Sequence, residues 1–322
     1  MSKIAAPTKV KRADLCFLHD AKECVPNGDP YTGMQRYDDK TERIMCSDVR
    51  IKRYARDFRD MVNIMTQNII PIYVLKIDRE EAGTINKNST GSATRIQMLR
   101  DMYGEIPVVD LLKKCWDPKL YGCVVTEKDQ NVHFTGSIQF KALNSSLNRV
   151  ELRLFQNTSV FESSMNKNQG SIGKTHLVPY ALISYTASVN PLAALALGTT
   201  EKDIIESLFY MWYGVNNYKS RSKTNQYSRL MLKINYKDPW HHSADVDTMI
   251  QLTNGNDLSL REFSQLEWDF SKMIKLIKKD IVSDVEYLVE ESFSAKFLDL
   301  MKEVKGKLTD ISSLKPTDFN IF

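Results

Sequence analysis

Residues 14–58 carry three consecutive signals that limit what this chain can fold into. Asp14–Asp20 is an apolar run with polar ends, which predicts a buried β-strand. Pro26–Pro30 reads Pro-Asn-Gly-Asp-Pro and predicts a turn, because Asn-Gly supports a positive φ and each proline blocks a helix or central strand. Ser47 and Asp48 then predict a helix start, as an N-cap residue followed by an early acid. This order predicts a helix packed against a sheet.

The predicted helix carries an apolar stripe beside a basic one. Its apolar residues recur at spacings of three and four: Ile51, Ala55, Phe58, Val62 and Met65. Lys52, Arg56 and Arg59 fall on the adjoining stripe, and Arg53 can pair with Asp57 one turn further on. A helix that packs on a sheet and presents cations beside the packed face suits a polyanion. The plainer interpretation is a solvated helix surface.

The composition is that of an ordinary globular protein and excludes several classes. The chain has 322 residues, of which 42% are hydrophobic and 26% charged, and its net charge is only +4, so any RNA site must be local. Its five cysteines form no Cys-x-x-Cys pair, which argues against a zinc site and a disulfide framework. No stretch approaches ~18 uninterrupted apolar residues, and no signal-peptide core is present. We therefore expect a cytoplasmic protein with no membrane contact, metal or cofactor.

The rest of the chain predicts a mixed α and β protein without internal repeats. Strands are expected at 69–77, 121–126, 132–140, 177–185 and 229–236, and helices at 96–114, 200–213 and 260–307. A polar loop is expected over 80–95, and a long polar excursion over 141–176, where loops of such length are usually functional or disordered. The hairpin implies antiparallel pairing, so this order favours a split β-α-β fold over a doubly wound sheet.

Several motifs together resemble one known family. Phe17–Lys22, Pro26–Pro30 and Ser47–Phe58 are similar to the N-terminal signature of the crRNA-binding backbone subunit of type I CRISPR surveillance complexes (Cascade), most closely its type I-B branch. Further matches follow at Tyr121-Gly122, Thr135–Phe140, Gly173-Lys174, Val178–Ile183, Arg221–Lys223 and Arg229-Leu230. The resemblance covers about Asp14 to Asp238. Val25 and Ser137 depart from the family pattern, at an asparagine and a proline respectively.

The resemblance implies an α+β fold with an RRM-like (ferredoxin-like) palm. It implies a single palm domain over 1–322, an inserted loop and helical region at 80–118, a thumb insertion at 141–177 and a C-terminal helical region at 258–310. The family's thumb reaches the neighbouring copy and displaces one crRNA base at regular intervals. Phe161 and Met165 are candidates for the residue that wedges the base step, although local packing is the commoner role of such residues.

The resemblance also implies which residues contact RNA. Carried over position by position, they are Asn27, Gly28, Ser47, Arg50, Lys52, Arg53, Arg56, Gln139, Lys141, Lys174, Arg221 and Lys223. Arginine and lysine suit a scaffold that holds phosphates, since phosphates position a strand without carrying sequence information. The implied partners are crRNA, the target DNA strand paired to it, further copies of this chain in a helical filament, and other Cascade subunits. The implied role is structural, with no catalytic residue.

Two other functions stay open. The first is a metal-dependent ribonuclease acting through Asp29 or Asp48, as in the related type III backbone subunits. Asp is a natural turn former at position 29 and favours a helix start at position 48, which are the structural interpretations of both acids. The second is an RNA-binding module without a CRISPR role. Two further motifs give weaker signals. Residues 168–175 end like a nucleotide-binding loop but lack its first glycine. His241-His242 could bind a metal, but adjacent histidines here suit a surface loop.

Overall fold

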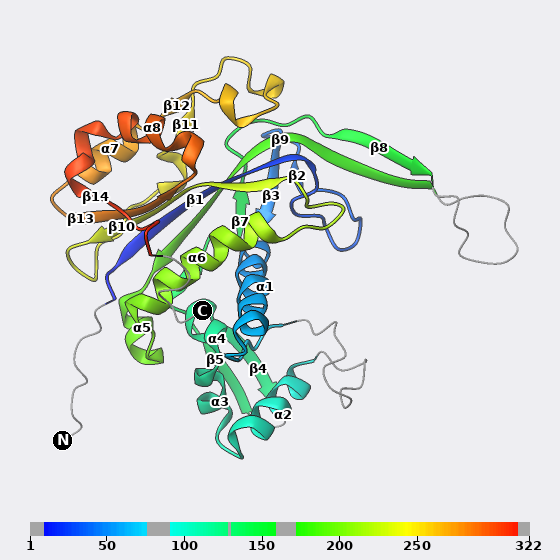
Figure 1. Ribbon diagram of the computed structural model, residues 1–322, viewed down its shortest axis with the longest axis vertical. Helices are drawn as coiled ribbons and strands as arrows, with labels where there is room; N and C mark the ends of the chain where they lie inside the picture. Colours follow the sequence, from blue (N-terminus) through cyan, green and yellow to red (C-terminus); the bar gives the residue numbers. More distant parts are fainter. Residues whose placement is uncertain (1–9, 76–90, 128–129, 159–171, 315–322) are drawn as a thin grey trace, which may run out of the picture.

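One large sheet forms the centre of the protein, which is a computed structural model that describes residues 10–75, 91–127, 130–158 and 172–314. The sheet has seven strands: β1 (Ala13–Cys24), β6 (Ile138–Phe140), β8 (Arg153–Thr158), β9 (Ile172–Val189), β10 (Gln226–Tyr236), β13 (Val282–Val289) and β14 (Leu308–Asp310). Their spatial order is β14-β13-β10-β1-β9-β6, and β8 pairs with the outer part of β9. Strand β1 lies in the middle, antiparallel to both β9 and β10 (Figure 1).

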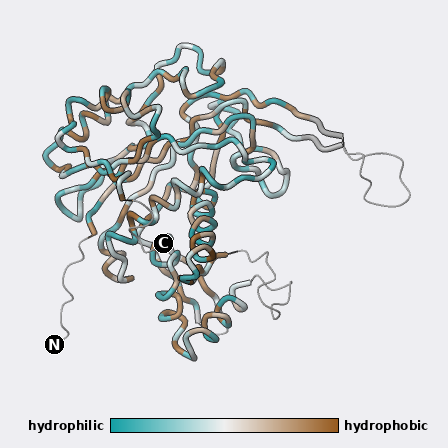
Figure 2. Tube along the Cα trace, in the orientation of Figure 1, coloured by the Kyte–Doolittle hydropathy of each residue, from teal (hydrophilic) through white to brown (hydrophobic). Residues whose placement is uncertain are grey.

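Helices cover both faces of the sheet. Side chains alternate along a strand, so Leu15 and Phe17 of β1 face α1 (Asp48–Thr66) and α6 (Glu201–Asn217), in one hydrophobic cluster. Cys16 and Leu18 point the other way, into a cluster with α7 (Ser271–Lys278) and α8 (Glu291–Leu300). Figure 2 shows hydrophobic segments running through the central strands. Double burial explains why this segment of β1 is apolar without alternation.

Helices α1 and α6 cross at close range on one face. A Cβ at Gly214 of α6 would lie 2.3 Å from the backbone oxygen of Tyr54 in α1, so only glycine permits this approach. Helix α6 begins where the sequence predicts, with a capping box between Thr200 and Asp203. Helix α1 also begins as predicted, at Asp48. The two helices are therefore fixed relative to the sheet and to each other.

A smaller lobe packs beside α1 and has its own hydrophobic cluster. It contains α2 (Ser92–Tyr103), α3 (Val108–Lys114), α4 (Trp116–Tyr121), β4 (Cys123–Glu127) and β5 (Gln130–Phe134). The predicted hairpin is confirmed as β4 and β5, but 138–140 leaves it and pairs with β9 as β6. The remaining short elements are β2 (Tyr37–Asp38), β3 (Arg43–Ser47), β7 (Leu143–Ser145), α5 (Pro191–Leu197), η1 (Val246–Thr248), β11 (Gln251–Leu252), η2 (Asp257–Ser259), η3 (Phe263–Gln265), β12 (Trp268–Asp269) and η4 (Lys302–Lys307).

The strand predicted at 69–77 is wrong for its described part, 69–75, which belongs to no strand. Side chains take the place of a partner strand there. Asn63 bonds to both the N–H and the C=O of Ile70, and the carboxylate of Asp117 accepts from the N–H groups of Tyr73 and Val74. The backbone is thus satisfied without a ladder.

The long helix predicted over 260–307 is also wrong. Helices α7 and α8 lie in this region, but β13 separates them and pairs with β10 along seven residues of register. Val282, Val285 and Tyr287 of β13 are buried against α7 and α8, in the second hydrophobic cluster. The β-branched and aromatic residues of 282–289 favour a strand once a neighbouring strand is available.

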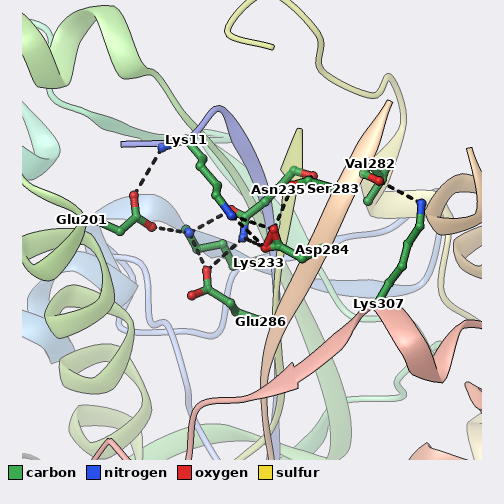
Figure 3. A network of polar contacts seen from close by, with 9 residues as sticks. All are labelled: Lys11, Glu201, Lys233, Asn235, Val282, Ser283, Asp284, Glu286 and Lys307. Atoms are coloured by element: carbon green, nitrogen blue, oxygen red, sulfur yellow. Dashed lines mark hydrogen bonds and ion pairs between the residues drawn. The ribbon is translucent and has the colours of Figure 1, made fainter. Parts of the chain in front are cut away.

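A buried lysine ties three distant segments together (Figure 3). The Lys233 side chain is 1% exposed, and its ammonium group bonds to Glu201 at the start of α6, to Asn235 and to Glu286 of β13. Lys11 contacts Asp284 nearby, with 2.7 Å between Nζ and Oδ1. Because a buried charge needs partners on every side, this cluster fixes the N-terminal segment against α6 and β13.

Strands β8 and β9 extend beyond the rest of the sheet as a projecting hairpin (Figure 1). Leu154 and Phe155 of β8 are about half exposed there. This hairpin lies within the segment expected to form a thumb. Phe161 and Met165 lie outside the described residues. None of the described helices is long and apolar enough to cross a membrane.

The buried His19 predicts a specific loss of stability in acid. Burial lowers the pKa of His19 from 6.5 to about 4, and its Nε2 atom has no hydrogen-bond partner among the described residues. The unfolded chain therefore binds this proton at higher pH than the folded one, so stability is fully present above about pH 6.5 and falls between there and pH 4. From pH 7 to 4.5 we expect this residue to lower the free energy of unfolding by about 2–3 kcal/mol.

The matched variant is His19→Phe, which keeps the stacking on Phe17 and Tyr185 and removes the titration. Urea unfolding at the two pH values should show a smaller decrease for the variant by that amount. Equal decreases in both proteins would contradict the assignment to His19.

Candidate nucleic-acid interface

The predicted turn is attached directly to the start of α1. The side-chain Oδ1 of Asn27 accepts hydrogen bonds from the backbone N–H of Ser47 at 2.6 Å and from its hydroxyl at 3.0 Å. Gly28 forms a bridge with Gln35, whose Oε1 accepts from the N–H of Asn27. On the other side, the N–H of Val25 bonds to Ser222. Three predicted segments, around residues 27, 47 and 222, therefore meet at one end of β1.

Three cations gather at this meeting point. Arg36, Arg50 and Lys223 all lie close enough to the buried Cys46 thiol to affect its pKa: burial raises this pKa to about 12, and the three positive charges lower it. Lys223 donates to the backbone oxygen of Val25 at 3.1 Å. Arg221 is exposed in the same loop. We call Arg36, Arg50, Arg221 and Lys223 the cation cluster.

Two members of the cation cluster repel each other without a carboxylate between them. Burial, followed by the positive charge of Arg50, lowers the pKa of Lys223. Neither Arg50 nor Lys223 forms an ion pair with a described residue, and Arg36 alone of the cluster has one, to Asp29 at 3.2 Å. An anion bound here would relieve the repulsion. The arrangement can therefore hold a phosphate.

The other predicted cations of α1 are already paired. Lys52 bonds to Asp48 at 2.6 Å, and Arg53 to Asp57 at 2.6 Å as the sequence predicts. Arg56 is buried, with its Nε 2.8 Å from the Asp117 carboxylate of α4. Arg59 is buried against Glu206 of α6. The basic stripe expected to face a polyanion thus turns into the protein interior along most of its length, and Arg56 is not at the surface.

The first N–H of α1, that of Asp48, bonds to the backbone oxygen of Ala142 at 3.1 Å, and no side chain caps the turn. Ser47 occupies the N-cap position, but its side chain makes no capping hydrogen bond, since its hydroxyl donates to Asn27 instead. A helix N-terminus of this kind favours an anion.

Gln139 and Lys141 precede a segment that contacts the start of α1, where the N–H of Asp48 bonds to the backbone oxygen of Ala142 at 3.1 Å. Gln139 and Lys141 line a polar pocket of about 350 Å³ together with Asp14 and Asp247, and Lys141 forms an ion pair with Asp247. Lys174 lies in β9, opposite Gln156 of the projecting hairpin. The structure therefore brings Asn27, Gly28, Ser47, Arg50, Arg221 and Lys223 together. Lys141 is paired with Asp247 instead, and Lys174 lies in the projecting hairpin.

The carboxylates of the ribonuclease hypothesis both serve local structure. Asp29 Oδ1 accepts from the N–H groups of Tyr31 and Thr32, and these bonds, the one from Tyr31 first, lower its pKa. Asp48 pairs with Lys52. No group of three or more histidine, cysteine or acidic residues that could hold a metal ion occurs within the described ranges, and His241 pairs with Asp238 in a surface loop.

Arg36 is the member of the cation cluster that sequence reasoning missed. It lies just beyond the turn, where strand β2 pairs with β3 and returns the chain to the start of α1. Its side chain contacts Asp29, seven residues earlier. The sequence did contain a signal for this contact: a basic residue, Arg36, ends a turn that has an acid, Asp29, near its start, and this pattern favours an ion pair across the turn.

Comparisons with known proteins identify the class. The family model described as CRISPR-associated protein Cas7 matches residues 11–271, which include the turn, α1 and the loop of Lys223. The CRISPR-associated protein Cas7 of Haloferax volcanii is 23% identical over 304 residues, covering 84% of each chain. A solved chain from a CRISPR RNA-guided surveillance complex, pre-nicking, has a similar fold, with a TM-score of 0.52 at 10% identity over 91% of this chain and 100% of that one.

This is a CRISPR-associated protein. Because the family model spans most of the chain, the protein belongs to the Cas7 family, and the family assignment predicted from the sequence is confirmed.

The buried ion pair predicts that Arg56 is needed for stability. Replacing it with alanine leaves the Asp117 carboxylate buried without its counter-ion, so Arg56→Ala should lower the free energy of unfolding by about 3–5 kcal/mol. Arg53→Ala is the matched control on the same helix, since its pair with Asp57 is partly exposed and should contribute about 0.3–0.5 kcal/mol. Denaturant unfolding measures both. Similar values for the two variants would contradict the structural role of Arg56.

Proposed function

We propose that this protein is a non-catalytic backbone subunit of a CRISPR surveillance complex, which binds guide RNA by its phosphates at the cation cluster. Membership of the Cas7 family supports a role in a CRISPR complex. The observation that carries the RNA site is the contrast along α1: Arg50 at its start has no carboxylate partner among the described residues, whereas Lys52, Arg53, Arg56 and Arg59 all have one. A phosphate meets least competition at Arg50.

The sheet supports an RRM-like palm as the scaffold. Four of its strands have the order β10-β1-β9-β6 and are all antiparallel, with α1 following β1 and α6 joining β9 to β10 on the same face. This is the arrangement of a split β-α-β fold. We propose that the β8–β9 hairpin is the base of a thumb that contacts a neighbouring copy.

Backbone contacts suit the proposed role. Phosphate contacts carry no sequence information, so one site can hold any guide while base pairing supplies specificity for the target DNA strand. Successive copies of the chain would then form a filament along the crRNA, in a complex of type I-B character with other Cascade subunits. Asn27 and Gly28 would position the turn, and Gln139, Lys141 and Lys174 would be further contacts to RNA.

Removal of the unpaired cations should weaken RNA binding in a salt-dependent way. Arg50→Ala and Lys223→Ala should each reduce the affinity for single-stranded RNA about tenfold at low salt. Each lost phosphate contact should also reduce the slope of log K against log salt by about 0.7. Fluorescence anisotropy over a salt series measures both quantities. Lys302→Ala, an exposed cation far along the chain in η4, is the control. Unchanged slopes in both cluster variants would reject this site.

The ribonuclease alternative is tested directly. Assembled complex incubated with complementary RNA and Mg²⁺ should leave the RNA uncut, because Asp29 and Asp48 are engaged in the turn and in α1. Periodic cleavage that disappears in Asp29→Asn would show that the subunit is a nuclease. The asparagine keeps an oxygen that can accept from the turn, so the turn geometry is retained.

A further inference from the structure

An aromatic side chain stands free at the tip of the turn beside the cation cluster. Tyr31 is 96% exposed, the highest value among the large hydrophobic side chains of the described residues, and Met34 beside it is 47% exposed. Neither residue is basic, and neither packs in the hydrophobic clusters. A tyrosine ring presented in this way to water is available as a contact surface.

The backbone beneath Tyr31 is held firmly. Asp29 accepts hydrogen bonds from the N–H groups of Tyr31 at 3.0 Å and Thr32 at 3.2 Å through its carboxylate, and from that of Gly33 at 2.8 Å through its backbone oxygen. Gly33 has a φ of +69°, which glycine adopts readily. The N–H of Asp29 bonds back to Met34 at 2.7 Å. The ring is thus presented by a closed turn, and little backbone freedom would be lost when a ligand binds.

The same turn contacts the cation cluster. The second carboxylate oxygen of Asp29 pairs with Arg36 at 3.2 Å, so the acid that shapes the turn also positions a cation. The N–H of Arg36 bonds to the backbone of Asn27, and Asn27 holds Ser47 at the start of α1. An aromatic ring on a turn that also binds a member of a cation cluster suits single-stranded nucleic acids, which use cations for phosphates and a flat π-surface for bases.

We propose that Tyr31 stacks on a nucleobase of the RNA strand whose phosphates lie on the cation cluster. This inference rests on the proposed function and adds a contact to it. Stacking is tolerant of sequence because every base has a π-face, so such a contact is compatible with a site that accepts any guide. Stacking also buries apolar surface without neutralising a phosphate, so its contribution does not depend on salt through counter-ion release.

The test compares two strands that differ only in their bases. The full-length protein is titrated with fluorescein-labelled single-stranded oligoadenylate and with an abasic ribose-phosphate strand of equal length. Tyr31→Ala should raise the Kd for oligoadenylate about tenfold, within the range known for loss of one base stack, and leave the salt slope unchanged. On the abasic strand the variant should bind as tightly as wild type. Tyr31→Phe should bind both strands normally.

Trp240→Ala is the control, because Trp240 is 72% exposed and lies beyond the opposite end of β10. Equal Kd values of wild type and Tyr31→Ala for oligoadenylate would overturn the inference. So would an equal loss on the abasic strand, which would indicate a contact to the sugar-phosphate chain. Unchanged RNA affinity with impaired assembly of the complex would assign Tyr31 to a protein interface instead. Failure of the wild-type protein to bind either strand would contradict the proposed function itself, and the stacking inference with it.

Discussion

The hydrogen bonds between the Asn27 side chain and Ser47 connect the sheet to the proposed ligand site. Strand β1 is paired on both edges as far as Ala21 and with β9 as far as Cys24, and it is covered on both faces. The turn at residues 26–30 follows this strand, and the side chain of Asn27 bonds it to Ser47 at the start of α1. The cations that follow are therefore positioned by the core rather than by a free loop, as a pre-organised binding surface requires.

The cations of helix α1 differ in whether a carboxylate lies opposite them. In its first turn, Arg50 has no carboxylate partner among the described residues. Further along, α4 supplies Asp117 to Arg56, and α6 supplies Glu206 to Arg59. A buried arginine without a partner would be strongly destabilising, so the paired residues belong to the fold. This division explains how a protein with a net charge of only +4 can have a local cluster of unpaired cations.

The sequence predicted those features that depend on neighbours in the chain. The helix starts at Asp48 and Glu201, the Arg53–Asp57 pair and the β4–β5 hairpin all arise within a few residues, and the structure confirms them. The fate of Arg56 could not be read, because Asp117 is 61 residues away. Segments 69–75 and 282–289 were misassigned for the same reason. The first lacks a partner strand and uses Asp117 instead, and the second becomes a strand because β10 is beside it.

The candidate site could also be predicted only where its residues are close together in the sequence. The family motifs predicted Asn27, Ser47, Arg50 and Lys223 as separate points, and the fold places them together through the bond of Val25 to Ser222. Arg36 and Tyr31 belong to no motif, and their role follows only from Asp29. Its carboxylate bonds to the N–H of Tyr31 and pairs with Arg36. A metal bound at Asp29 would compete with Arg36 for the second carboxylate oxygen. The same contacts make Asp29 the link between the backbone of Tyr31 and the side chain of Arg36, which the proposed binding function requires.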